Sequence, residues 1–361
     1  MKRVVMILFL VLIRLSALQG EELTIVTINV WSGLTYEGML RMGEYESSNI
    51  RERRYSILVN QVRRLNPDII ALQEANKLPH YASRLARDLG MDRIYSVGLG
   101  GMRMGCLGIP TNLKEGDAIL AKPEWQLKRV RAVRLSGKGI ISDVVSFHFS
   151  ESNQAIVGKV VCDNSPIYII NVHTHAGMEK DVYWSERMDF WLDSGKYSSM
   201  ERRDAVHSIY KDVQRRQTEV RRLLGWISRA LPPDAPVILM GDFNASPDQP
   251  EIRWIGGNGF LDTYSAVNYA GIPGYTWNPN KNLNIQQHYL LSPPDSNLTL
   301  IQRLRQENQQ RAKRIDYIFI RPGQMQIEIL ESRIVFNKTE EGHHPSDHFG
   351  VMTRIRWGDE G

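Results

Sequence analysis

The sequence predicts an α/β protein in which paired β-sheets form the centre and helices cover them. Short apolar runs typical of buried strands recur along the whole chain. Two amphipathic helical stretches interrupt these runs, and strands outnumber helices without alternating regularly with them. No internal repeat, low-complexity segment or domain linker divides the sequence, so we expect one domain over residues 21–361.

The first twenty residues have the pattern of a bacterial secretory signal. Lys2 and Arg3 precede an apolar run from Val4 to Ile13, and small and polar residues follow. This run is too short to cross a bilayer as a permanent helix. We expect residues 1–20 to be removed on export to the periplasm or the medium; the alternative is a buried N-terminal strand or helix.

The cysteine content excludes a disulfide framework, and the net charge does not require a nucleic-acid partner. Loss of Lys2, Arg3 and Arg14 with the signal lowers the formal net charge from +5 to +2, so no strong basic excess demands a nucleic-acid partner. The two cysteines, Cys106 and Cys162, are too few for a disulfide framework, although they permit one bridge in an oxidising compartment.

Nine runs after the signal have the composition of strands. They lie at Leu23–Asn29, Asp68–Gln73, Asp117–Ala121, Ala155–Cys162, Pro166–Val172, Pro236–Met240, Arg314–Ile320, Gln326–Phe336 and Phe349–Trp357. Several of them are bounded by a carboxylate, an amide or an imidazole. This pattern indicates a polar cleft assembled from strand ends.

Two stretches have helical periodicity, and three have no clean period. Apolar residues recur on one face over Tyr55–Leu65 and again over Arg203–Ala230. We expect loops at Val97–Glu115, Ala176–Glu201 and Ala270–Arg311. Because loops of this length within a compact domain are often functional, they are our candidates for substrate choice.

The polar residues at the strand ends fall into two chemical groups. Asn29, Glu74 and Asp242 each follow an apolar run, and such oxygen donors suit a hard cation, Mg²⁺ or Mn²⁺. The Asp and His of Ser346–His348, with the Asp of Arg314–Asp316, can supply an oriented proton acceptor. Hydrolysis of a phosphoester needs these residue types, which activate water and stabilise charge.

The segments resemble motifs of the endonuclease/exonuclease/phosphatase superfamily of metal-dependent phosphoesterases. Six of them occur in the family order: Thr27–Trp31, Asp68–Glu74, Asn171–His173, Gly241–Asn244, Arg314–Ile318 and Ser346–His348. Each alone has an ordinary explanation as a turn or a strand end, but together they cover nearly the whole chain after the signal. The resemblance implies a DNase-I-like four-layer sandwich of two packed mixed β-sheets flanked by helices.

The resemblance also implies a metal site and a phosphate-binding histidine. Asn29 and Glu74 would lie at the Mg²⁺ or Mn²⁺, with Glu74 as the principal ligand and Asp347 beside the metal. His173 would stabilise charge on the phosphate. His175 stays a minor candidate, because two positions further along a strand a side chain points to the same face.

The remaining implied roles concern the attacking water. Asp242 would activate or orient this water, and Asn244 would hold it or a phosphate oxygen. His348 would contact the phosphate or act as the base, with Asp316 as its orienting partner. The resemblance leaves open whether Asp242 or His348 takes the proton.

Within the superfamily, the sequence is most similar to neutral sphingomyelinases and related phospholipase-C-like members. Arg314–Ile318, the long basic helix after His173 and the run Lys180–Tyr183 carry this similarity. It implies hydrolysis of a phosphodiester by in-line attack of an activated water. The substrate would be a lipid headgroup, with peripheral membrane contact and no obligate protein partner.

Three alternatives remain at the level of the sequence. A secreted DNase-I-like nuclease would bind nucleic acid through basic residues such as Arg51 and Arg303. An inositol-phosphate-type phosphatase would use the same metal chemistry on a soluble substrate. A non-catalytic binding protein on the same fold would have lost site residues, and none of the eight is missing.

Overall fold

The computed structural model describes residues 20–33, 46–104, 107–137, 139–140, 146–148, 152–162, 165–269 and 271–358. Of the expected signal only Gly20 is among them, and Cys106 lies outside them. The signal and a bridge between Cys106 and Cys162 therefore stay predictions.

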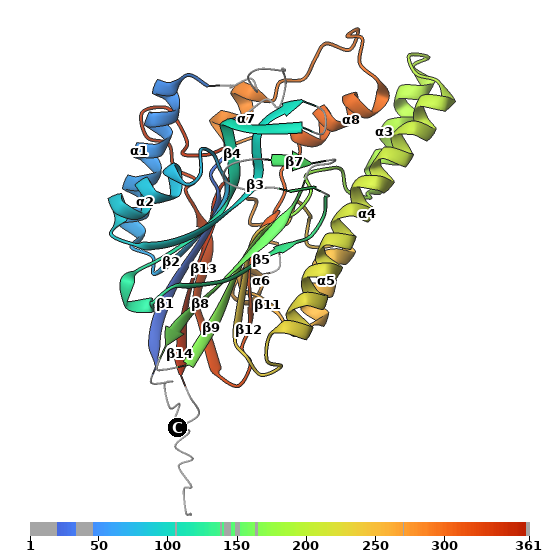
Figure 1. Ribbon diagram of the computed structural model, residues 1–361. Helices are drawn as coiled ribbons and strands as arrows, with labels where there is room; N and C mark the ends of the chain where they lie inside the picture. Colours follow the sequence, from blue (N-terminus) through green and yellow to red (C-terminus); the bar gives the residue numbers. More distant parts are fainter. Residues whose placement is uncertain are drawn as a thin grey trace, which may run out of the picture.

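Two mixed β-sheets form the centre of the molecule (Figure 1). The first has the order β13-β14-β1-β2-β4-β7-β6, with β3 paired to β4, and the second has the order β11-β12-β10-β9-β8-β5. The first sheet consists of β13 (Gln326–Val335), β14 (Gly350–Gly358), β1 (Glu21–Asn29), β2 (Ile69–Ala75), β3 (Asp92–Met104), β4 (Leu107–Ala121), β7 (Ser146–His148) and β6 (Gly139–Ile140). The second consists of β11 (Leu261–Asp262), β12 (Asp316–Arg321), β10 (Val237–Asp242), β9 (Ser165–His173), β8 (Gln154–Cys162) and β5 (Lys128–Arg134).

Helices cover the outer face of each sheet, as Figure 1 shows with α1 and α2 on one side and α4 and α5 on the other. The helices are α1 (Ser48–Leu65), α2 (His80–Leu89), α3 (Val182–Asp193), α4 (Ser199–Ala230), α5 (Pro250–Gly257), α6 (Thr263–Val267), α7 (Leu283–His288), α8 (Leu300–Gln309) and the 3₁₀ turn η1 (Pro123–Trp125). In the described part of the chain, none of them has the length and apolarity to cross a bilayer.

Alternating side chains of the central strands fill separate layers of the core. Ile25 of β1 packs with Ile238 of β10 between the two sheets, whereas the next residue, Val26, packs with Leu58 of α1. In the second sheet, Leu239 faces the opposite way from Ile238 and belongs to the apolar cluster beneath α4 and α5. Because successive strand residues point to opposite faces, these runs read as continuously apolar, and the expected four layers are confirmed.

Three expected loops contain regular structure. The described residues of Val97–Glu115 lie in the paired strands β3 and β4, although the glycines and methionines of this stretch weaken the strand pattern. Ala176–Glu201 contains α3, whose apolar residues face α4 and α8 in a separate small cluster. Ala270–Arg311 contains the short helices α7 and α8. These predictions were wrong because short helices and twisted hairpins have weak periodicity.

Strand direction brings the polar segments to one edge of the sandwich. The strands β1 and β2 run parallel and end together, with Asn29 opposite Gln73. In the second sheet β9 and β10 also run parallel, with His173 opposite Asp242. Since β12 runs antiparallel to β10, its first residue, Asp316, lies opposite Asp242. The ends of two pairs of strands, β1 with β2 and β9 with β10, thus meet the start of β12 at the same edge.

Candidate active site

Asn29 links the two sheets at this edge. Its side chain is fully buried, and its Nδ2 donates to Glu74 Oε1 at 2.9 Å and to Asp242 Oδ2 at 3.1 Å. Its Oδ1 accepts the backbone N–H of Trp31 at 3.0 Å, which fixes the orientation of the amide. Asn29 therefore holds the two carboxylates that the sequence assigns to metal and water.

Glu74 lies where β2 leaves its regular path. Its φ is +55°, a left-handed conformation that a non-glycine residue rarely adopts away from functional sites. Ser32 donates its N–H and its Oγ–H to Glu74 Oε2, at 3.1 and 3.2 Å. Burial alone would raise the pKa of the Glu74 carboxyl, but the charge of His173 and the Asn29 hydrogen bond lower it overall.

Asp242 and His173 lie beside Asn29 and Glu74, and the four residues form one cluster at this edge. Gly241 before Asp242 has a φ of +138°, and a Cβ there would lie 1.9 Å from the carbonyl oxygen of Val172, so only glycine fits. His173 Nε2 lies 3.6 Å from Asp242 Oδ2 and 4.0 Å from Glu74 Oε1. Burial lowers the pKa of His173, but these two carboxylates outweigh it and raise that pKa to about 9.

His348 is held by Asp316 at the same edge. The His348 Nδ1 and the Asp316 Oδ2 are 3.0 Å apart, and the Nε2 of His348 lies 3.9 Å from Asp242 Oδ2. Burial lowers the pKa of His348, yet the charge and hydrogen bond of Asp316 raise it well above its ordinary value. The imidazole is therefore oriented by Asp316, as the resemblance implies, and favours the protonated form.

Asp347 is held by residues other than Asp316. Tyr289 donates its hydroxyl to Asp347 Oδ2 at 2.9 Å, and the Nδ2 of Asn282 donates to the carbonyl oxygens of Ser346 and Asp347. Burial, together with the charge of Glu74, raises the pKa of Asp347 to about 6, although His348 opposes this shift. A cation beside Glu74 and Asp347 would relieve this repulsion.

Asn244 and His175 are both engaged by neighbouring residues. The Asn244 N–H donates to Asp242 Oδ1 at 2.8 Å, and its Nδ2 donates to the carbonyl of Thr174 at 3.0 Å, which fixes the turn after β10. The His175 Nε2 lies 3.2 Å from Asp212 Oδ1 of α4. His175 thus pairs with a helix, whereas His173 faces the carboxylate cluster.

Asp117 belongs to the cluster and was missed in the sequence. It was counted only as the first residue of a strand, but it lies well inside β4. Because β4 runs antiparallel to β2, with Ala118 opposite Leu72 and Gly116 opposite Ala75, Asp117 lies beside Glu74. Burial raises the pKa of Asp117 to about 7; the charge of His173 opposes this rise, and the charges of Glu74 and Asp242 add to it. Strand direction, which a run of residues does not reveal, was the missing signal.

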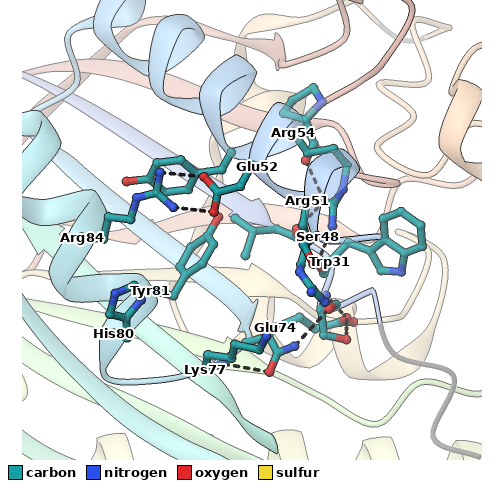
Figure 2. A pocket seen from close by; sticks show the side chains of 15 residues that line it. Trp31, Ser48, Arg51, Glu52, Arg54, Glu74, Lys77, His80, Tyr81 and Arg84 are labelled. Atoms are coloured by element: carbon teal, nitrogen blue, oxygen red, sulfur yellow. Dashed lines mark hydrogen bonds and ion pairs between the residues drawn. The ribbon is translucent and has the colours of Figure 1, made fainter. Parts of the chain in front are cut away.

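Two cavities meet at Glu74. The smaller, of about 230 Å³, lies between α1 and the chain after β1 and β2, and Figure 2 shows its lining, with Trp31, Arg51, Glu74 and Lys77 among the labelled side chains. The larger, of about 370 Å³, contains Asp242, Asp347 and His348 together with residues of α8. A group bound at Glu74 would therefore have room for a substituent on each side.

The donor set of this edge fits a hard divalent cation. Asp242, Asp316 and His348 offer ligand atoms within 4.8 Å of one another, although His348 Nδ1 already contacts Asp316. Glu74 and Asp347 add carboxylate oxygens, and Asp316 Oδ1 is buried without a hydrogen-bond partner among the described residues. Oxygen donors of this kind suit Mg²⁺ or Mn²⁺ better than softer metals.

Solved structures with the same fold come from animals and bacteria. Danio rerio TDP2 complexed with a single-strand DNA product is 17% identical with a TM-score of 0.56, over 93% of this chain and 99% of that one. An endonuclease/exonuclease/phosphatase family protein from Bacteroides thetaiotaomicron is 18% identical with a TM-score of 0.56, over 95% and 100%. Another from Leptotrichia buccalis is 17% identical with a TM-score of 0.53, over 92% and 99%.

At these identities the structures show the fold, which is the DNase-I-like sandwich. No curated protein matches the sequence significantly. The sequence profile of the Endonuclease/Exonuclease/phosphatase family, however, matches residues 26–348, from β1 to the histidine held by Asp316. The chain therefore belongs to the Endonuclease/Exonuclease/phosphatase family.

Proposed function

We propose that this protein is a metal-dependent phosphodiesterase whose active site is the cluster around Glu74. The single observation that carries the proposal is the position of two imidazoles beside buried carboxylates. His173 and His348 both lie within 4 Å of Asp242 Oδ2, and each has a raised pKa. Two imidazolium groups around one carboxylate suit a dianionic, trigonal-bipyramidal phosphoryl group with a water beside Asp242.

Each residue of the cluster has its own role in the proposed reaction. His173 and His348 donate hydrogen bonds to phosphate oxygens, and the Asp316 hydrogen bond keeps the His348 Nε2 turned toward the phosphate. Because the His348 imidazole favours the protonated form, Asp242 is the better acceptor for the proton of the attacking water. Asn244 fixes the Asp242 carboxylate through its backbone N–H.

The metal would lie at Glu74 and Asp347, with Asn29 orienting Glu74. A divalent cation held by these carboxylates would supply positive charge to the phosphate oxygens. Asn29 can bind a metal only through Oδ1, which accepts the Trp31 N–H in the structure. We therefore assign Asn29 to positioning Glu74 rather than to direct ligation.

The two cavities support a diester substrate, and the charge of the smaller cavity favours an anionic substituent on it. A monoester needs one substituent pocket, whereas Glu74 has a cavity on each side. Four Arg and Lys side chains line the smaller cavity. Arg54 pairs with Glu46 and Arg84 with Glu52, so Arg51 and Lys77 remain against the carboxylate of Glu74, which disfavours a cationic choline group there. A nucleic-acid strand is thus our first candidate, and the structure of Danio rerio TDP2 with a single-strand DNA product is consistent with it.

A phospholipid such as sphingomyelin is the second candidate. Val182 and Phe190 of α3, and Leu290 and Leu291 after α7, are more than half exposed. Tyr289, which precedes this pair of leucines, donates to Asp347 in the cluster. Apolar side chains near the site can enter a lipid surface, and this is the observation that favours a lipid substrate. We also propose that the protein is exported, on the signal-like residues 1–20.

The test is a panel of substrates with matched variants. Single-stranded DNA, RNA, sphingomyelin, phosphatidylcholine and an inositol phosphate are each incubated with the purified protein in Mg²⁺, in Mn²⁺ and in EDTA. We expect metal-dependent cleavage of DNA, and its loss in Asp242→Asn and His348→Ala. Turnover of sphingomyelin without cleavage of DNA would reverse the order of the two candidates, and no turnover of any diester would refute the phosphodiesterase.

A further inference from the structure

Lys313 lies in the larger cavity, and the proposed reaction does not use this residue. It lines that cavity together with Asp242 and His348. Its backbone pairs with Trp277, whose own backbone pairs with His348 in a second antiparallel bridge. Residues opposite one another in antiparallel pairs project to the same face, so the side chains of Lys313, Trp277 and His348 emerge together.

The Lys313 ammonium has no anionic partner in the described part of the chain. No carboxylate or hydrogen-bond acceptor of the described residues pairs with its Nζ, although Glu179 and Asp242 attract its charge from further away. Glu179 is instead engaged by the N–H and the hydroxyl of Ser246. Burial, with Arg311 and Arg216 nearby, lowers the pKa of Lys313 to about 8.

Lys313 is only partly buried, so its ammonium keeps part of its hydration. The partial loss of hydration still favours pairing of the ammonium with an anion. Lys313 is rigidly placed, since Trp277 donates to its carbonyl and accepts its N–H at 3.0 and 2.8 Å. An anionic partner can reach this ammonium from the cavity that Lys313 lines.

We propose that Lys313 is a specificity-determining residue that pairs with a second phosphate of the substrate, next to the scissile diester. The carboxylates of Glu74, Asp242 and Asp347 occupy the inner part of the same cavity and repel an additional anion there. Lys313 and Arg305 supply the positive charge on the α8 side. Arg305 is partly engaged by Ser208 and Asp212, which leaves Lys313 as the principal donor.

The second phosphate can belong to a nucleic-acid strand or to a phosphorylated alcohol. Two matched sets of ligands distinguish these sources. The first is a thymidine dinucleotide without a terminal phosphate, with a 5′-phosphate and with a 3′-phosphate. The second is glycerophosphoinositol with and without a phosphate on its ring. The proposal rests on the proposed phosphodiesterase, but binding is measured in EDTA and needs no turnover, so each can fail alone.

Calorimetry should show that the wild-type protein binds a phosphorylated member of one set about tenfold more tightly than its unphosphorylated counterpart. In Lys313→Met this preference should vanish while affinity for the unphosphorylated ligand stays unchanged. In Lys211→Met, a control on the exposed face of α4, the preference for the phosphorylated ligand should persist. The set that shows the preference identifies the source of the phosphate.

Thermal unfolding separates binding from a structural role. Removing a partly buried charge that pairs with no described carboxylate should leave the Tm of Lys313→Met equal to or above that of the wild type. No preference in the wild type, or the same preference in Lys313→Met, would overturn the proposal. A lowered Tm with equal loss of affinity for both members of a set would also overturn it, because Lys313 would then support the fold.

Discussion

The His348 Nδ1 and the Asp316 Oδ2 lie 3.0 Å apart, although the two residues are 32 positions apart in the sequence. Asp316 is itself fixed, since its N–H and that of Ile315 both donate to Thr276 Oγ1. With Nδ1 engaged, the Nε2 of His348 is directed toward Asp242. The orientation of the imidazole is thus set by a strand of the second sheet.

Asp316→Asn should lower kcat on a phosphodiester by at least about a hundredfold, because the imidazole loses both its orientation and the charge that keeps it protonated. KM should change little. Steady-state kinetics measures both parameters. Asp248→Asn, in the exposed turn after β10, is the matched control and should keep wild-type kinetics. A wild-type kcat in Asp316→Asn would contradict the assigned orientation.

Glu74→Gln should abolish the stabilisation of the protein by Mg²⁺. A cation that binds only the folded state raises Tm with its concentration, and the neutral amide removes the carboxylate that we propose as its principal ligand. Thermal unfolding at increasing Mg²⁺ concentration should give a rising Tm for the wild type and for Glu124→Gln, an exposed control. If Glu74→Gln shows the same rise as the wild type, the metal lies elsewhere.

Asp117→Asn should raise the stability of the metal-free protein by about 1 kcal/mol, since it removes one of several buried carboxylates that repel one another. The same change should weaken the effect of Mg²⁺ on Tm. Urea unfolding in EDTA measures the first effect. A loss of stability in EDTA would mean that Asp117 is paired in the folded protein and does not belong to the crowded carboxylates.

His344 should make folding stability depend on pH. Its Nδ1 accepts the Leu283 N–H at 3.2 Å, and burial lowers its pKa below the ordinary value of 6.5. The unfolded chain therefore takes up a proton before the folded protein does. The contribution of His344 should be fully present above pH 6.5 and should be lost as the pH falls toward the lowered pKa.

Urea unfolding at pH 7.5 and pH 5.5 measures this dependence. The difference in the free energy of unfolding between the two conditions should be smaller in His344→Gln than in the wild type. His207→Gln, an exposed histidine of α4, should retain the wild-type difference. An unchanged difference in His344→Gln would show that another group carries the pH dependence.

The sequence was sufficient to predict the strands that carry the cluster. β1, β2, β9, β10 and β12 are buried on both faces, so their apolar runs are unmistakable, and each meets the cluster at a polar residue. The order of Asn29, Glu74, His173 and Asp242 along the chain then identifies the family. The hydrogen bonds from Asn29 to Glu74 and Asp242, and the approach of His173 Nε2 to both carboxylates, confirm that the structure brings the four residues together.

Other parts of the site depend on contacts that no local pattern contains. Asp117 enters through the antiparallel direction of β4, and Tyr289 reaches Asp347 from 58 positions away. Lys313 faces the cavity because Trp277 pairs with it and with His348. Side chains placed by long-range pairing in this way follow from tertiary structure, and sequence periodicity does not report them.

The hydrolysis of bis(p-nitrophenyl) phosphate tests the central claim most directly. The wild-type protein in Mg²⁺ should release p-nitrophenolate, and EDTA or His348→Ala should reduce the rate by at least about a hundredfold while the far-ultraviolet circular dichroism and Tm of the variant stay near those of the wild type. A rate that is unaffected by EDTA, or retained in folded His348→Ala, would contradict the account.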